Sequence, residues 1–274
     1  MKILISADME GITGVTTWPQ VTPGHAEYGR FRSLMTADVN AAVRGAFAAG
    51  ATDVVVSDGH WNGSNILVEE LDPRARLNSG SPSPMSMMQG IDQGVNGVLF
   101  IGYHARQGSH LAVLDHTWSD TCVAGVWLNG APAGEYTLNA GVAAHYGAPV
   151  LMASGDQTAC AQMLEQLGPL ETAVVKQATG RFSAECLPPE ATCELIEQAA
   201  RQGVQRLAAQ SAPPPFLVRL PAELTVQLVS SDMADRASLI PGVTREGTRL
   251  TFTAPDMPQA YATFRALVLL SYPR

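Results

Sequence analysis

The amino-acid sequence predicts an α/β protein with a mostly parallel sheet flanked by helices and a smaller C-terminal α+β lobe. Three observations lead to this prediction. Apolar runs without polar alternation recur along the first 180 residues, helical patterns separate them, and shorter alternating segments with turn residues follow. Unbroken apolar strands are typical of a parallel sheet that helices cover on both faces.

The expected core contains four strands that are short apolar runs. They are KILISA at residues 2–7, TDVVVSDGH at 52–60, GVLFIGYH at 97–104 and APVLMASGD at 148–156. Helical spacing of apolar residues predicts helices at 33–50 and 134–147, which end at Gly50 and Gly147. A turn-rich stretch, NSGSPSP, and a short methionine-rich helix are expected before the third strand.

The pattern of apolar residues changes near residue 180, from unbroken apolar runs to shorter, alternating segments. We expect residues 1–180 to form the α/β core and residues 181–274 to form the lobe, packed on the core as part of a single chain unit. Residues 187–210 predict a helix with proline near its first turn. Residues 216–231 and 242–254 predict short strands joined by hairpin turns.

Composition excludes several classes of protein. The 274 residues carry a net charge of −8 and no block of Lys or Arg, which argues against a nucleic-acid partner. No apolar stretch is long enough for a membrane span, and the N-terminus does not resemble a secretory signal. The four scattered cysteines form no CxxC pair, so a thiolate zinc site is not expected, and free thiols favour a cytoplasmic location.

Polar side chains follow three of the expected strands. Asp8 and Glu10 come after the first, Asp58 and His60 end the second, and His104 ends the third. Because loops at the carboxyl ends of neighbouring parallel strands meet over one crevice, we expect these side chains to lie close together. Such a set of nitrogen and oxygen ligands suits zinc and, less specifically, manganese or cobalt. The sequence therefore predicts a metal site.

Each of these residues also has an ordinary structural interpretation. An aspartate at the end of a strand often caps a helix or a turn, and a lone histidine there often makes only a structural hydrogen bond. The conjunction of three such strand ends favours the metal site. A dinucleotide site is excluded, because the first turn reads ADMEGITG, without GxGxxG and with acids where a pyrophosphate would lie.

Five motifs occur in a specific order along the first two thirds of the chain. They are SADMEGITG, SDGHWNG, IGYHARQG, LDHTWSD and GEYTLNAG. Together they resemble the D-aminopeptidase family of dipeptide-transport operons, which are metallopeptidases of family M55. The resemblance implies an α/β core that carries an active site with two zinc ions per subunit.

The resemblance also implies which residues hold these ions. Asp8 would bridge the two zinc ions, Glu10 and His60 would complete one site, and His104 and Glu135 would complete the other. Glu135 enters only through the resemblance, because a glutamate in the first turn of a helix ordinarily just complements the helix dipole.

For catalysis, the resemblance implies that His116 in LDHTWSD acts as the acid and base or holds the transition state. Three residues are expected to support the site from behind the ligands. Asp58 would support His60, Asp115 would orient the His116 ring or shape the turn, and Asn139 would lie just beyond Glu135 on the same helix.

The function that follows from this resemblance is hydrolysis of the N-terminal residue of short peptides or amino acid amides, with a preference for D-residues. The family also implies a homo-oligomer, expected to be a decamer. Two alternatives stay open: a metallohydrolase that acts on another amide, such as an L-aminoacyl one, and a non-catalytic protein that binds metal or peptide. A histidine such as His116, in addition to the ligands, favours an enzyme.

Overall fold

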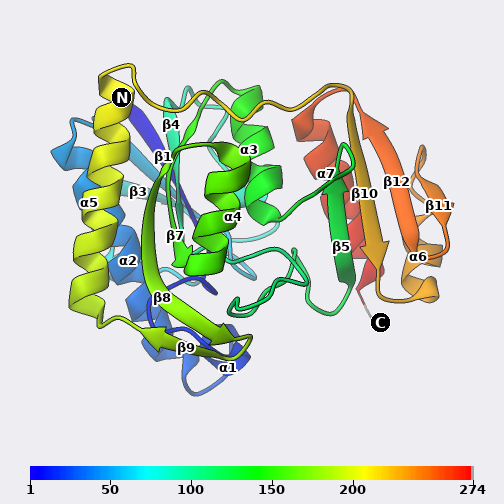
Figure 1. Ribbon diagram of the computed structural model, residues 1–274, viewed down its shortest axis with the longest axis horizontal. Helices are drawn as coiled ribbons and strands as arrows, with labels where there is room; N and C mark the ends of the chain where they lie inside the picture. The colour runs from blue at the N-terminus through cyan, green and yellow to red at the C-terminus, as the bar shows by residue number, and fades with distance from the viewer. Residues whose placement is uncertain (273–274) are drawn as a thin grey trace.

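The computed structural model describes residues 1–272, which form two sheets (Figure 1). Sheet A has the order β3-β2-β1-β4-β7-β8-β9, and sheet B has the order β11-β12-β10-β5-β6. The strands of sheet A are β1 (Lys2–Ala7), β2 (Asp53–Asp58), β3 (Ala75–Asn78), β4 (Gly97–Ile101), β7 (Val150–Asp156), β8 (Glu171–Gly180) and β9 (Ser183–Cys186). Those of sheet B are β5 (Val123–Leu128), β6 (Ala131–Pro132), β10 (Ala222–Leu228), β11 (Thr244–Glu246) and β12 (Arg249–Ala254).

Sheet A is parallel except for its last pair. Neighbouring strands from β3 to β8 pair in parallel, and β9 pairs with β8 in the antiparallel direction. The prediction of a mostly parallel sheet is confirmed. After β1 the chain continues outward to β2 and β3 and then returns to β4 on the other side of β1. The carboxyl ends of β1 and β4 therefore form the switch point at which open α/β sheets bind ligands.

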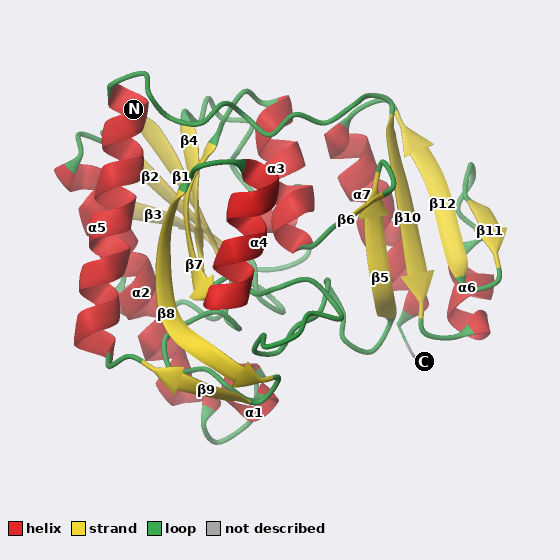
Figure 2. Ribbon diagram, viewed as in Figure 1, coloured by secondary structure: helices red, strands yellow, loops and turns green. Residues whose placement is uncertain are grey.

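Helices cover both faces of sheet A (Figure 2). The helices are α1 (Trp18–Val21), α2 (Tyr28–Ala48), α3 (Glu135–His145), α4 (Gln157–Leu167), α5 (Pro189–Ala208), α6 (Ser231–Ala237) and α7 (Met257–Ser271), with single 3-10 turns η1 (Val68–Glu70) and η2 (Ser86–Met88). Helices α2 and α5 lie on one face and α3 and α4 on the other, while α6 and α7 pack on sheet B. None of the helices within residues 1–272 is long and apolar enough to cross a bilayer.

Successive residues of β1 explain why its sequence shows no alternation. Ile3 and Ile5 belong to the core under α2 and α5, whereas Leu4 belongs to the core under α3 and α4. All three are fully buried, so both faces of the strand must be apolar. The expected helix at 33–50 is confirmed as α2, and Gly50 follows it with a φ of 91°, a conformation that glycine adopts without strain.

The two sheets are not separated at residue 180. Strands β5 and β6, before that position, belong to sheet B, where β5 pairs with β10. Strand β9 and helix α5, after it, pack on the core, with α5 against α2 and β8. The expected boundary therefore does not coincide with the division between the sheets, because the chain leaves the core after β4, adds two strands to sheet B and returns through α3.

A buried polar cluster ties the loop after β1 to two helices. Asp38 of α2 accepts hydrogen bonds from the backbone nitrogen and the hydroxyl of Thr13, both at 3.0 Å. The hydroxyl oxygen of Thr13 also lies 2.8 Å from the hydroxyl oxygen of Thr192 on α5. Burial raises the pKa of Asp38 to about 6 despite these hydrogen bonds.

This raised pKa predicts a pH-dependent contribution to stability. Asp38 holds its proton more tightly in the folded protein, so its contribution is fully present below pH 4 and is lost as the pH rises through 6. The loss amounts to about 3 kcal/mol in the free energy of unfolding. Asp38→Asn lacks this component. Its free energy of unfolding relative to that of the wild type should therefore rise by about 3 kcal/mol from pH 4 to pH 7.

Urea unfolding of the metal-free protein at the two pH values measures the difference. The exposed Asp92 supplies the matched control, Asp92→Asn, which should follow the wild type at both pH values. An unchanged difference in stability between wild type and Asp38→Asn at pH 4 and pH 7 would contradict the assignment.

Candidate metal centre

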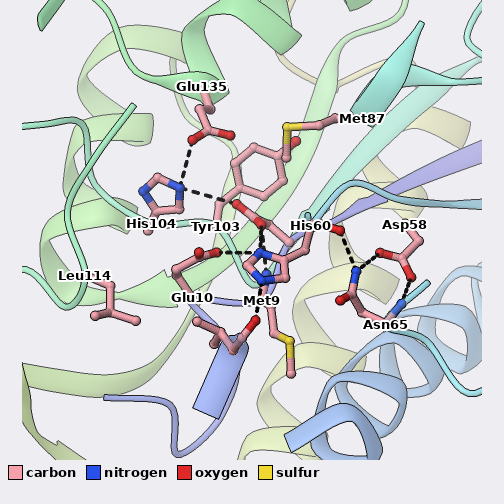
Figure 3. Close-up of polar contacts among 12 residues, drawn as sticks. Met9, Glu10, Asp58, His60, Asn65, Met87, Tyr103, His104, Leu114 and Glu135 are labelled. Carbon is pink, nitrogen blue, oxygen red and sulfur yellow. Dashed lines mark hydrogen bonds and ion pairs between the residues drawn. The ribbon is translucent and has the colours of Figure 1, made fainter. Parts of the chain in front are cut away.

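The five residues predicted to bind metal lie together at the carboxyl edge of sheet A, and Figure 3 labels four of them, Glu10, His60, His104 and Glu135. Asp8 and Glu10 follow β1, His60 follows β2, His104 follows β4, and Glu135 is the first residue of α3. All five are buried, with exposed fractions between 2% and 6%. The ends of three parallel strands and the start of one helix therefore bring together side chains that lie far apart in the sequence.

Asp8 occupies the centre of this group. Its Oδ1 lies 3.3 Å from Nδ1 of His60, and that nitrogen lies 3.2 Å from Oε2 of Glu10. Its Oδ2 lies 3.4 Å from Nε2 of His104, and that nitrogen lies 3.1 Å from Oε1 of Glu135. The two carboxylate oxygens of Asp8 thus face two separate pairs, each made of one imidazole and one carboxylate.

Three imidazoles share one hydrogen-bonding pattern, in which one ring nitrogen contacts a backbone carbonyl. The contacts are His60 Nε2 to Val21 O (2.7 Å), His104 Nδ1 to Ala105 O (3.0 Å) and His116 Nδ1 to Leu114 O (2.8 Å). Because a carbonyl only accepts, the nitrogen at each contact carries the proton. When such a ring is neutral, as metal binding requires, its other nitrogen presents a lone pair toward the carboxylates.

Lone pairs that face carboxylate oxygens in a buried site need a positive charge between them. Oδ2 of Asp8 and Oε2 of Glu10 are buried and have no hydrogen-bond partner within residues 1–272. A metal cation would satisfy both oxygens and the imidazole lone pairs. Mixed nitrogen and oxygen donors of this kind fit zinc, and carbonyl-bound imidazoles are typical of zinc ligands.

The electrostatics of the cluster favour a cation. Burial lowers the pKa of His60, but Glu10 and Asp8 outweigh it and raise this pKa well above its usual value. Burial also lowers the pKa of His104, but Glu135 and Asp8 outweigh it and raise this pKa well above its usual value. Burial raises the pKa of Glu10, whereas for Asp8 the two histidines overcome burial and lower the pKa well below its usual range. The cluster thus attracts positive charge strongly.

His116 lies beside this cluster in a different electrostatic environment. Its ring stacks on that of His104 with centroids 4.0 Å apart and forms a T-shaped pair with Trp18, with centroids 5.4 Å apart. Burial and the neighbouring His104 hold the pKa of His116 well below its usual value, so the ring is neutral. Its Nε2 lies 3.9 Å from Glu10 and 3.7 Å from Glu135, too far for a hydrogen bond, and is available to a substrate.

Asp115 does not hydrogen-bond to the His116 ring. Its carboxylate accepts from the backbone nitrogens of Gly108 (2.7 Å) and Ser109 (3.0 Å) and pairs with Arg181 at 3.1 Å. The carbonyl of Leu114 holds the ring instead. Of the two roles expected for Asp115, this geometry matches the shaping of the turn.

Asp58 contacts the loop that carries His60. Its carboxylate accepts from the backbone nitrogen of Asn65 at 2.6 Å and from the Asn65 amide at 2.7 Å. The same amide donates to the carbonyl of His60 at 2.6 Å. Asp58 therefore fixes the backbone of His60 through Asn65.

Asn139 lies one helical turn beyond Glu135 but makes its contacts behind the site. Its amide donates to the hydroxyl of Tyr103 at 2.8 Å, and that hydroxyl lies 2.7 Å from the hydroxyl of Ser6 on β1. Glu135 itself accepts from the backbone nitrogen of Trp118 at 2.7 Å. Asn139 thus joins α3 to the strand ends without touching the metal-facing atoms.

Two glycines allow the loops after β1 and β4 to cross. The backbone nitrogen of Gly11 donates to the carbonyl of Gly102 at 2.8 Å. A Cβ at Gly11 would lie 2.0 Å from the carbonyl oxygen of Tyr103, and one at Gly102 would lie 2.3 Å from that of Asp8. A larger residue at either position would push Asp8 and His104 apart.

A cavity of about 840 Å³ opens beside the cluster. Its walls include Asp8, Glu10, His60, His116 and Glu135. Three tryptophans, Trp18, Trp61 and Trp118, and the cavity-facing side of α7 complete the lining. The site is therefore open to a small organic molecule with both polar and apolar parts.

Comparison with known proteins identifies the family. The model of peptidase family M55, described as D-aminopeptidase, matches residues 1–266. The chain belongs to this family. The resemblance in the five sequence motifs is thereby confirmed, and the chain is a metallo-aminopeptidase.

Relatives of this M55 peptidase match it over nearly the whole length. It is 35% identical to the D-aminopeptidase of Bacillus subtilis (strain 168) over 278 residues, which are 99% of this chain and 98% of that protein. A solved structure, the Zn-dependent D-aminopeptidase DppA from Bacillus subtilis, described as a self-compartmentalizing protease, matches with a TM-score of 0.94 and 34% identity, over 99% of this chain and 98% of that one.

The M55 peptidase contains one buried cation that the sequence analysis missed. Lys176 on β8 is 1% exposed, and its ammonium donates to the carbonyls of Glu10 (2.7 Å), Ile12 (2.9 Å) and Val15 (2.7 Å). Burial lowers the pKa of Lys176 to about 8. The only sequence signal is a single lysine within the apolar run AVVKQA. Lys176 holds the loop in which Glu10 lies.

Loss of this ammonium should destabilise the protein strongly. Lys176→Met leaves the buried carbonyls of Glu10 and Val15 without a donor, while that of Ile12 keeps the backbone nitrogen of Val15, and the free energy of unfolding should fall by about 3 kcal/mol. Lys2, the other lysine of the sequence, lies near the surface, so Lys2→Met should cost less than about 1 kcal/mol. Urea unfolding of the metal-free proteins compares the two, and equal stabilities would refute the role of Lys176.

Proposed function

We propose that this chain is a zinc-dependent aminopeptidase with two zinc ions per subunit, which removes an N-terminal D-residue from short peptides. The observation that carries the proposal is the position of Asp8, whose two oxygens face separate imidazole and carboxylate pairs. The zinc dependence of the related DppA and the D-aminopeptidase activity in the names of both relatives support it.

Asp8 would bridge the two ions, Glu10 and His60 would hold one, and His104 and Glu135 would hold the other. Zinc in such a site supplies a Lewis acid that polarises the scissile carbonyl and makes a nucleophilic water available near neutral pH. The hydrogen bonds from His60 and His104 to backbone carbonyls fix the tautomer that such ligands need.

His116 would transfer the protons. The carbonyl of Leu114 holds its Nδ1–H, so Nε2 is the nitrogen that takes a proton from the attacking water. Glu10 and Glu135, each within 4 Å of Nε2, stabilise the charged ring. The charged ring then gives this proton to the leaving amine.

When loaded with zinc, the site would also bind the free amine of a substrate through its lone pair. This requirement for a free amine explains cleavage at the N-terminus rather than within a chain. The preference for D-residues is inferred from the names of the two relatives, both D-aminopeptidases. We also propose a cytoplasmic homo-oligomer, expected to be a decamer, in keeping with the self-compartmentalizing relative.

A metallohydrolase that acts on L-aminoacyl or other small amides is the second candidate. The same site could hold either substrate, and a panel of D- and L-aminoacyl peptides and amides with added zinc distinguishes them. A non-catalytic binding protein is disfavoured, because both relatives are named for D-aminopeptidase activity.

Metal content should depend on the two histidines. His60→Ala and His104→Ala should each lower the zinc content per subunit and abolish hydrolysis, because each removes one nitrogen ligand from the cluster. Elemental analysis of the purified proteins together with the peptide panel measures both effects. His145→Ala on the exposed end of α3 is the control and should keep metal and activity. Full zinc content in both variants would overturn the ligand assignment.

His116→Ala should separate metal binding from proton transfer. We expect this variant to bind zinc like the wild type, while kcat falls several hundredfold, within the about 10²–10⁴-fold range of a positioned acid or base. Steady-state kinetics of zinc-loaded protein, with zinc content measured on the same sample, tests this. A variant with full kcat would show that His116 transfers no proton.

A further inference from the structure

One wall of the cavity comes from the helix α7, far in sequence from the metal cluster. Ala262, Ala266 and Leu269 line it at helical spacing and present small or apolar side chains. Arg265 lies among them. It is the one arginine or lysine in the cavity lining within residues 1–272, whereas the acids of the lining are Asp8, Glu10, Asp120 and Glu135.

The contacts of Arg265 leave its charge without an acidic partner. Its Nη1 donates to the carbonyl of Pro84 at 2.7 Å and its Nη2 to that of Ser83 at 2.8 Å. The guanidinium carbon lies 5.7 Å from the ring centroid of Tyr261. No carboxylate within residues 1–272 lies within 4 Å of it. A guanidinium carries five N–H donors, so these two hydrogen bonds hold Arg265 in place and leave other N–H groups available to a ligand.

A free peptide carries two different groups at its ends. Its amine suits the zinc-loaded site of Asp8, Glu10 and Glu135, and its terminal carboxylate suits a cation elsewhere in the same cavity. We propose that Arg265 binds the C-terminal carboxylate of the substrate and thereby selects short peptides with a free C-terminus over amides. This inference rests on the proposed function and adds to it a residue that determines specificity.

Two features of the cavity support this assignment. Arginine matches a carboxylate with two parallel hydrogen bonds, and such charge-assisted pairs are stronger than neutral ones. The lining also includes Trp61, which is 62% exposed and pairs with His60, and Trp118, which packs against Tyr261 and Phe264 of α7. Both tryptophans suit the apolar part of a peptide.

The test compares one dipeptide as free acid and as amide. With D-Ala-Gly, Arg265→Met should lower kcat/KM roughly tenfold to a hundredfold, mainly through KM, because a charge-assisted hydrogen bond is lost. With D-Ala-Gly amide the same variant should change kcat/KM less than about threefold. Arg265→Lys keeps the charge and should recover part of the loss on the acid. The control is Arg249→Met. Arg249 is an exposed residue of β12 whose guanidinium lies over Trp127 of β5, so this variant should leave kcat/KM for both substrates unchanged.

The outcomes distinguish a role in substrate binding from a structural role. An equal loss on acid and amide would mean that Arg265 only holds the segment at Ser83 and Pro84, and no loss on either would mean that it does not contact substrate. Both results overturn the inference. Calorimetric titration of the two peptides into zinc-loaded His116→Ala protein, with and without Arg265→Met, measures the same preference without turnover. A wild type that hydrolyses neither peptide would contradict the proposed function, while this titration would still decide the role of Arg265.

Discussion

The burial of three carboxylates in one small volume is the constraint on which the structure of the site depends. Asp8, Glu10 and Glu135 are each less than 7% exposed, and like charges this close are unfavourable away from water unless cations compensate them. In their neutral tautomers the imidazoles present lone pairs rather than N–H groups to these acids, so a metal-loaded site takes its positive charge from the ion. The described chain is therefore shaped around positive charge that it does not carry.

This constraint explains the arrangement of the surrounding backbone. Carbonyls of Val21, Ala105 and Leu114 each fix one imidazole, so the ring orientation does not depend on the cation. On the far side of the first loop, the ammonium of Lys176 binds three more carbonyls and keeps Glu10 in place. Rigid supports of this kind keep donors within reach of an ion and limit the reorganisation needed on binding.

Much of the core could be predicted from the sequence, because local patterns specify it. Uninterrupted apolar runs such as Ile3–Ile5 need two covered faces, and the parallel sheet then brings Asp8, His60 and His104 to one edge. Glu135 could not be found in this way, since a glutamate in a first helical turn has an ordinary explanation. It required the ordered motifs of the family.

Other features escaped prediction because they depend on contacts between distant segments. Strand β5 is short, and its pairing with β10 joins positions about one hundred residues apart, so no local pattern assigns it to the second sheet. Lys176 appears in the sequence as a polar interruption of a strand. Asp115 was a plausible partner for the adjacent histidine, but backbone nitrogens and Arg181 satisfy its carboxylate instead.

The excursion of the chain between β4 and α3 ties the second sheet to the chemistry. His104 precedes this excursion, His116 lies within it and Glu135 follows it, while β5 and β6 at its far end form part of the antiparallel sheet. The smaller lobe is thus no detachable module. A cut at residue 180 would remove β10 and leave β5 with an open edge. Recombination between homologous proteins could exchange this lobe only together with the segment between His104 and Glu135.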